Sequence, residues 1–159
     1  MQMSPELTFL GNTDLWTLRK TALLCSMRFS AGSVLKSYDW ATEMIKENRC
    51  VISGFHSKLE KDVCDLLLRG NKSVIWVLAR SMFKRTPPKL KSHIEAGRVL
   101  IVSQFPPGNE QRTRELATKR NQFVVDNADE IVFAHIYKGG MLDNLKIRDG
   151  IKVKVLDRE

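Results

Sequence analysis

Residues that bind metals or form disulfides are scarce in this sequence. Its 159 residues include three cysteines and three histidines. Cys25, Cys50 and Cys64 have no Cys-x-x-Cys spacing, and His93 and His135 have no metal-ligand spacing. We therefore expect three buried thiols in a reducing compartment and no metal site.

The sequence also lacks the motifs of common enzyme classes. It contains no Gly-x-Ser-x-Gly elbow, no His-Glu-x-x-His and no Walker loop. Gly-x-Gly-x-x-Gly is missing as well, which argues against NAD binding. We therefore expect no catalytic residues, no cofactor and no enzymatic activity.

Long apolar runs and targeting signals are missing too. No run approaches the ~18 apolar residues of a membrane span, and residues 1–6 have neither the basic start nor the apolar core of a signal peptide. These features predict a cytoplasmic protein. The length predicts a single domain over residues 1–159, with a lead-in segment over 1–20 and no additional terminal domain.

Positive charge is abundant and concentrated in one region. The formal net charge is +8, and residues 80–120 contain ten Lys and Arg against three Glu, a net +7. Charge gathered in this way raises the local concentration of polyanions and indicates a phosphate-rich partner. From charge alone, a solvated basic face without a ligand explains the pattern equally well.

Short apolar runs alternate with helical patterns along the chain. Runs at residues 21–25, 50–54, 74–79, 99–102 and 130–134 have the length and composition of strands buried on both faces. Residues 151–155 alternate in the manner of an edge strand. This order predicts an α/β fold with a mostly parallel sheet, right-handed crossovers and helices on both faces.

Several helix ends are also marked in the sequence. Ser33 is the predicted N-cap of the first helix, and Ser57 with Glu60 fits a capping box at the start of the next. Gly70 stands where the left-handed residue after a helix belongs. After the turn at residues 106–108, a basic helix is predicted over residues 109–120.

The loops that follow the strands are rich in small, polar and basic residues. They cover residues 26–33, 53–57, 80–85, 103–108 and 138–140. Because parallel strands end at the same edge of a sheet, we expect these loops to meet in a crevice whose helix N-termini and cations bind anions. The loops also carry aromatic rings that can stack on bases, namely Phe29, Phe55, Phe83 and Tyr137.

Six ordered segments match the motifs of one family. They lie at residues 7–15, 22–28, 51–54, 103–108, 119–121 and 138–142, and Ser103-Gln104-Phe105-Pro106-Pro107-Gly108 differs at one residue from the family's Ser-Glu-Phe-Pro-Pro-Gly. In these motifs the chain resembles the DNA-processing protein A family, also called DprA or Smf. The likeness covers most of residues 7–142.

The resemblance implies an extended Rossmann fold with a basic pocket that binds single-stranded DNA. It further implies a homodimer that takes part in DNA recombination and natural transformation by handing DNA to the RecA recombinase. The positions that carry over are Ser26, Arg28, Ser53, Gly54, Lys119, Arg120 and Asn121. Arg80 joins the predicted phosphate-binding set because it lies in the basic loop after the 74–79 strand.

The chain departs from the family pattern at Cys25, Met27, residues 56–60 and Gln122, which predicts a smaller or differently shaped pocket. Two alternatives therefore stay open. One is a sensor or phosphoribohydrolase-like protein that binds a nucleotide or nucleotide derivative. Of the Pro-Gly-Gly-x-Gly-Thr loop of such hydrolases, only Gly139-Gly140 is present. The other is an interaction module that binds no nucleic acid.

Overall fold

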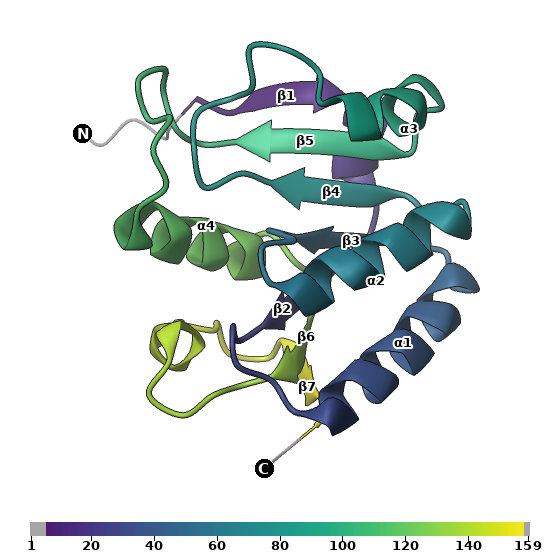
Figure 1. Ribbon diagram of the computed structural model, residues 1–159, viewed down its shortest axis with the longest axis vertical. Coiled ribbons are helices and arrows are strands. Elements are labelled where there is room, and N and C mark those ends of the chain that lie inside the picture. The colour runs from purple at the N-terminus through teal and green to yellow at the C-terminus, as the bar shows by residue number, and fades with distance from the viewer. Residues whose placement is uncertain (1–5, 158–159) are drawn as a thin grey trace.

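A computed structural model describes residues 6–157, and its seven strands form one twisted sheet (Figure 1). The strands pair in the order β1-β5-β4-β3-β2-β6-β7. All neighbours are parallel except β1, which is antiparallel to β5. The strand bounds are β1 Thr8–Gly11, β2 Lys20–Cys25, β3 Cys50–Ser53, β4 Val74–Val77, β5 Val99–Ser103, β6 Glu130–His135 and β7 Lys152–Val155.

Helices cover both faces of the sheet. One face carries α1 (Ala31–Ile45), α2 (Lys58–Arg69), the 3₁₀ turn η2 (Pro88–Leu90) and α3 (Lys91–Glu95). The other carries η1 (Thr13–Thr17), α4 (Arg114–Asp126) and η3 (Met141–Asn144). The predicted mostly parallel sheet with helices on both faces is therefore confirmed, as is the edge position of the last strand.

The apolar runs become strands because both of their faces are buried. In β5, Val99 and Ile101 belong to the core on the sheet face that carries α1, α2 and α3, whereas Leu100 and Val102 belong to the core on the face that carries η1 and α4. This alternation is the period of two that a pleated strand imposes.

The prediction that the chain has no signal peptide is made from residues 1–6. Of these, residues 1–5 lie outside the described residues.

The three cysteines are buried and unpaired, as predicted. Burial raises the pKa of Cys25 to about 12, of Cys50 to about 11 and of Cys64 to about 12. The thiols therefore stay protonated near neutral pH and behave as small apolar groups. Among the described residues, no helix combines the length and apolarity that a membrane span needs.

Two predicted helix ends are wrong in detail. The N-cap of α1 is Ser30, not Ser33: the Ser30 hydroxyl accepts a hydrogen bond from the Ser33 N–H at 3.1 Å. Gly70 caps α2 with a φ of −84°, and the left-handed residue is Asn71 with a φ of 60°. Gly70 instead leaves room for α1, because a Cβ there would lie 2.5 Å from Cδ1 of Ile45.

The basic helix predicted over residues 109–120 is displaced along the chain. It begins after Thr113, whose hydroxyl accepts a hydrogen bond from the Leu116 N–H at 3.1 Å, and it continues to Asp126. The residues before Thr113 form a loop that pairs with the loop after β4 through a bridge between Ser81 and Phe105. As a result, the segment 119–121 lies within the helix and not at its end.

An ion pair crosses the centre of the sheet edge at which the parallel strands begin. Arg49 precedes β3, Glu130 starts β6, and their side chains meet at 2.6 Å with exposed fractions of 22% and 12%. Since β2 lies between these two strands, the pair joins segments far apart in the sequence.

We predict that Arg49→Leu lowers the free energy of unfolding by about 1–3 kcal/mol, because the poorly exposed Glu130 carboxylate loses its partner. The matched control is Glu47→Gln, which removes the more exposed second partner of Arg49 and should cost less than about 0.5 kcal/mol. Urea unfolding measures both. Equal losses in the two variants would contradict this account.

Candidate functional site

Two neighbouring cavities open where the parallel strands end. The strand order runs from β2 to β5 on one side and then returns to β6 on the other, so β2 and β6 are neighbours at the point where the order reverses. Open α/β sheets bind ligands at such a point. A cavity of about 460 Å³, the switch-point cavity, lies here, with Ser26, Arg28, Glu60, Asn121, Tyr137 and Gly140 among its lining residues.

The second cavity, of about 330 Å³, is the arginine cavity. Its lining includes Gly54, Trp76, Arg80, Phe83 and Arg112. Five residues line both cavities, namely His56, Arg114, Ala117, Arg120 and Met141. The two cavities therefore lie side by side with shared walls, and together we call them the strand-end groove.

The loops after β2 and β6 hold each other in place at the switch-point cavity. The Ser26 hydroxyl accepts a hydrogen bond from the Tyr137 N–H at 2.7 Å, and the Ser26 N–H donates to the His135 carbonyl at 3.0 Å. Arg28 donates to the Tyr137 hydroxyl at 3.1 Å and lies 5.0 Å from the centre of its ring. The mouth of the cavity thus presents an exposed guanidinium at a defined place.

A buried carboxylate joins the end of β2 to the start of α2. Glu60 accepts hydrogen bonds from the N–H groups of Cys25 at 2.8 Å and His56 at 2.7 Å. Burial raises the pKa of Glu60, and the opposing effects are these hydrogen bonds and the charge of Arg120. The serine half of the predicted capping box is confirmed, because the Ser57 hydroxyl accepts from the Glu60 N–H at 3.1 Å.

Arg120 lies at the junction of the two cavities. Its guanidinium donates to the Asn121 side-chain oxygen at 2.9 Å and rests against Gly54, where an added Cβ would lie 2.5 Å from Cζ. Glycine at position 54 therefore leaves the space that this side chain occupies. Burial lowers the pKa of Arg120, and the charge of Glu60 opposes that shift.

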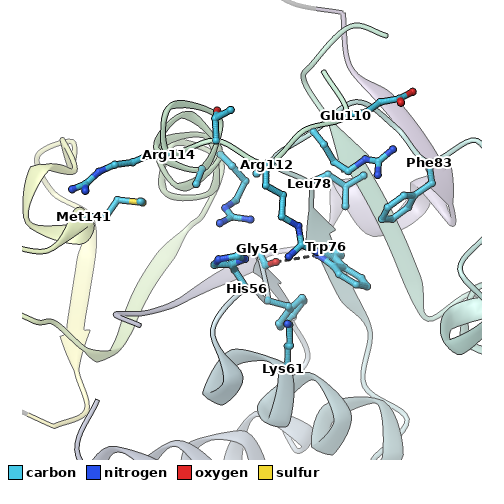
Figure 2. Close-up of a pocket in the computed structure, with 16 residues that line it drawn as sticks. Gly54, His56, Lys61, Trp76, Leu78, Phe83, Glu110, Arg112, Arg114 and Met141 are labelled. Carbon is cyan, nitrogen blue, oxygen red and sulfur yellow. Dashed lines mark hydrogen bonds between the residues drawn. The ribbon is translucent and has the colours of Figure 1, made fainter. Parts of the chain in front are cut away.

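The arginine cavity combines cations with aromatic rings (Figure 2). Trp76 donates to the Gly54 carbonyl at 3.0 Å, and its ring meets Phe83 edge-on at 6.5 Å. Arg80 lies 4.9 Å from the centre of the Phe83 ring. Figure 2 shows Arg112 extending toward Gly54 and Trp76.

The pKa of His56 is affected by the positive charges around the strand-end groove. Partial burial lowers the pKa of His56 first, and the charges of Arg120, Arg112 and Lys61 lower it further. Three cations from three different segments thus act on one imidazole, which is the condition expected where an anion is to be bound.

The sequence pattern of the DNA recombination-mediator protein A family matches residues 1–147. The chain belongs to this family. DNA processing protein A (DprA) from Streptococcus pneumoniae has a similar structure, with a TM-score of 0.68 and 18% identity over 85% of this chain and 48% of its own. No curated protein matches the chain.

A second solved structure gives the same result. It is DNA processing protein A from Helicobacter pylori, described for its single-stranded DNA binding mode, with a TM-score of 0.66 and 20% identity over 84% of this chain and 62% of its own. At these identities the likeness shows the fold. This family member spans less than two thirds of the length of either protein.

Most of the residues that the sequence predicted to bind phosphates line the same groove. Six of the eight line the strand-end groove, namely Ser26, Arg28, Gly54, Arg80, Arg120 and Asn121. Their role in binding DNA stays a prediction. Arg112 and Arg114 also line the groove and were missing from the predicted set, although they belong to the same basic run.

Ser53 and Lys119 lie elsewhere. Ser53 is fully buried, and its hydroxyl accepts from the N–H of Phe55, whose φ is 44°. It therefore shapes the loop from beneath. Lys119 pairs with Glu115 at 3.2 Å and borders a separate shallow hollow, so it does not line the strand-end groove with Arg28.

Two of the four rings proposed to stack on bases line the strand-end groove from accessible positions. They are Phe83 and Tyr137. Phe55 is 2% exposed and packs against Trp76, so its ring is a core side chain and is not open to a base. Within residues 6–157, no three His, Cys, Asp or Glu side chains group in a way that would hold a metal ion.

We predict that Glu60→Gln lowers the free energy of unfolding by about 2–4 kcal/mol, because the amide NH₂ faces a buried N–H that then has no acceptor. Glu115→Gln, on the exposed face of α4, is the control and should change it by less than about 0.5 kcal/mol. Denaturant titration at neutral pH measures both. A Glu60→Gln variant as stable as this control would show that the carboxylate does not hold β2 to α2.

Proposed function

We propose that this protein binds single-stranded DNA through its phosphates, without reading base sequence, along the strand-end groove. One observation carries the proposal: arginines from separate segments line the two adjacent cavities of the strand-end groove. They are Arg28 after β2, Arg80 after β4, Arg112 and Arg114 around the start of α4, and Arg120 within it.

The arrangement suits a chain of phosphates better than a single anion. A guanidinium grips a phosphate through two parallel hydrogen bonds, and here the guanidinium groups are spread over two adjacent cavities. The rings of Phe83 and Tyr137 lie beside Arg80 and Arg28, where bases of the same strand can stack. The likeness to the H. pylori protein supports this choice of ligand.

Membership of the family supports a role as a mediator of DNA recombination. We extend the proposal to the other properties that the resemblance implies: a cytoplasmic homodimer, without enzymatic activity, that hands single-stranded DNA to the RecA recombinase during transformation. Transfer to the recombinase depends on the DNA being bound first.

Titration of a labelled single-stranded oligonucleotide at several salt concentrations tests the proposal. We expect log K to fall linearly with log salt, with a slope of about −0.7 for each phosphate contacted. The double variant Arg112→Ala with Arg114→Ala should weaken binding at low salt and make the slope shallower by about 1.4, since two contacts are lost.

Lys119→Ala is the matched control, because it removes a cation from the same helix as Arg114 but outside the groove. It should leave the slope nearly unchanged. No binding at low salt would reject the proposal. If the protein does not bind oligonucleotides but mononucleotides raise its melting temperature, the nucleotide-binding alternative is favoured.

DNA binding should also depend on the protonation of His56. The pKa of His56 is lowered in the free protein, so the imidazole is neutral at pH 7. A bound phosphate offsets the surrounding positive charges and raises that pKa, so the complex takes up a proton as the pH falls. We therefore expect the affinity for DNA to increase as the pH falls from about 8 to about 5.5.

His56→Asn should flatten this pH dependence while leaving affinity near pH 8 almost unchanged. Anisotropy titrations at constant ionic strength measure the effect. If the variant and the original protein show the same pH dependence, bound phosphates do not lie near His56.

A further inference from the structure

A second groove opens on the sheet face that α1 and α2 cover. In most crossovers between parallel strands a helix covers the sheet, but between β4 and β5 the chain forms only η2 and the five-residue α3. The space left beside α2 is a cavity of about 920 Å³. We call it the α2–α3 groove.

The walls and floor of the α2–α3 groove are mainly apolar. Phe55 and Trp76 lie at its floor, α2 contributes Leu68, and the opposite wall includes Pro88 and Leu90. The volume lies within the range of ligand-binding pockets. An apolar groove of this size on the surface of a protein indicates a binding site for an apolar group.

The rim of the groove is positively charged. Lys61, Arg69 and Lys89 are exposed along it, against the single carboxylate of Asp65. The imidazole of His93 also lines the groove, and its Nδ1 makes no hydrogen bond within residues 6–157.

We propose that the α2–α3 groove binds an acidic peptide segment of a partner protein. Large apolar side chains of the peptide occupy the floor, and its carboxylates face Lys61, Arg69 and Lys89. The complementary charges set the orientation and speed the encounter, whereas the apolar floor supplies most of the affinity.

The composition of the two grooves favours a peptide over a continuation of the DNA. The arginine cavity has five Lys or Arg side chains against Glu110, whereas the α2–α3 groove has three against Asp65 and is walled by aliphatic groups. Phe55, Lys61 and Trp76 border both spaces. The bound peptide would therefore lie directly beside the strand-end groove.

Fluorescence polarisation with a labelled synthetic peptide tests this inference. The probe is a run of aspartates followed by a leucine and a phenylalanine. We expect binding to this peptide, and loss of binding when lysines replace the aspartates or alanines replace the two apolar residues. Arg69→Glu combined with Lys89→Glu should weaken binding by at least about tenfold.

The matched control is Lys152→Glu combined with Lys154→Glu, the same charge change on exposed residues of β7 at the far edge of the sheet. It should stay within about twofold of the original protein. All four positions are exposed, and melting temperatures check that the variants are folded.

Failure to bind the aspartate peptide, or equal weakening by the two charge reversals, would overturn the proposal. The proposal also fails if the peptide does not bind and the double variant Arg69→Glu with Lys89→Glu loses its binding of single-stranded DNA. In that case the α2–α3 groove continues the path of the DNA. The double variant Arg112→Ala with Arg114→Ala should keep its affinity for the peptide. The two proposals therefore succeed or fail separately.

Discussion

The parallel pairing of β2 with β6 is the constraint on which the site depends. The two strands are more than a hundred residues apart in the sequence, yet Leu23 pairs with Val132 and Leu24 with Phe133. Because both end at the same edge, the Ser26 loop and the Tyr137 loop meet and bond to each other. Without this pairing the crevice at the strand-order reversal would have only one wall.

The burial of two opposite charges then affects the net charge at the surface of the strand-end groove. Glu60 and Arg120 are both buried in its wall, and each opposes the effect of burial on the pKa of the other. The carboxylate is already engaged by two backbone N–H groups, whereas the arginines above are largely open to solvent. Positive charge therefore exceeds negative charge at the surface of the groove, and it adds to the effect of partial burial in lowering the pKa of His56.

The sequence was sufficient for the positions of the strands along the chain but not for the direction of individual side chains. Continuous apolar runs identify doubly buried strands because a parallel sheet needs them, and β2 to β6 appear where these runs lie. Lys119 and Arg120 show the limit. Neighbouring side chains on a helix point about 100° apart. Because the predicted start of α4 was wrong by five residues, the directions of the Lys119 and Arg120 side chains could not be predicted.

Contacts between distant segments were equally out of reach of local patterns. The capping-box pattern predicted that Glu60 lies near its own N-cap, but its bond to Cys25 depends on how α2 packs on β2. Gly70 looked like a turn residue because glycine favours left-handed backbone, whereas its actual requirement comes from Ile45 on another helix. Such requirements appear only when two elements are placed side by side.

The unusual crossover between β4 and β5 connects the two grooves. Its first part brings Arg80 and Phe83 to the arginine cavity, and its second part forms the Pro88 wall of the α2–α3 groove. A full-length helix in this crossover would cover Trp76 and fill the second groove. It would also replace the loop that carries Arg80, because the chain between the strands is only 21 residues long, from 78 to 98. The short α3 therefore leaves the α2–α3 groove open, and the loop that precedes η2 and α3 supplies Arg80 to the arginine cavity.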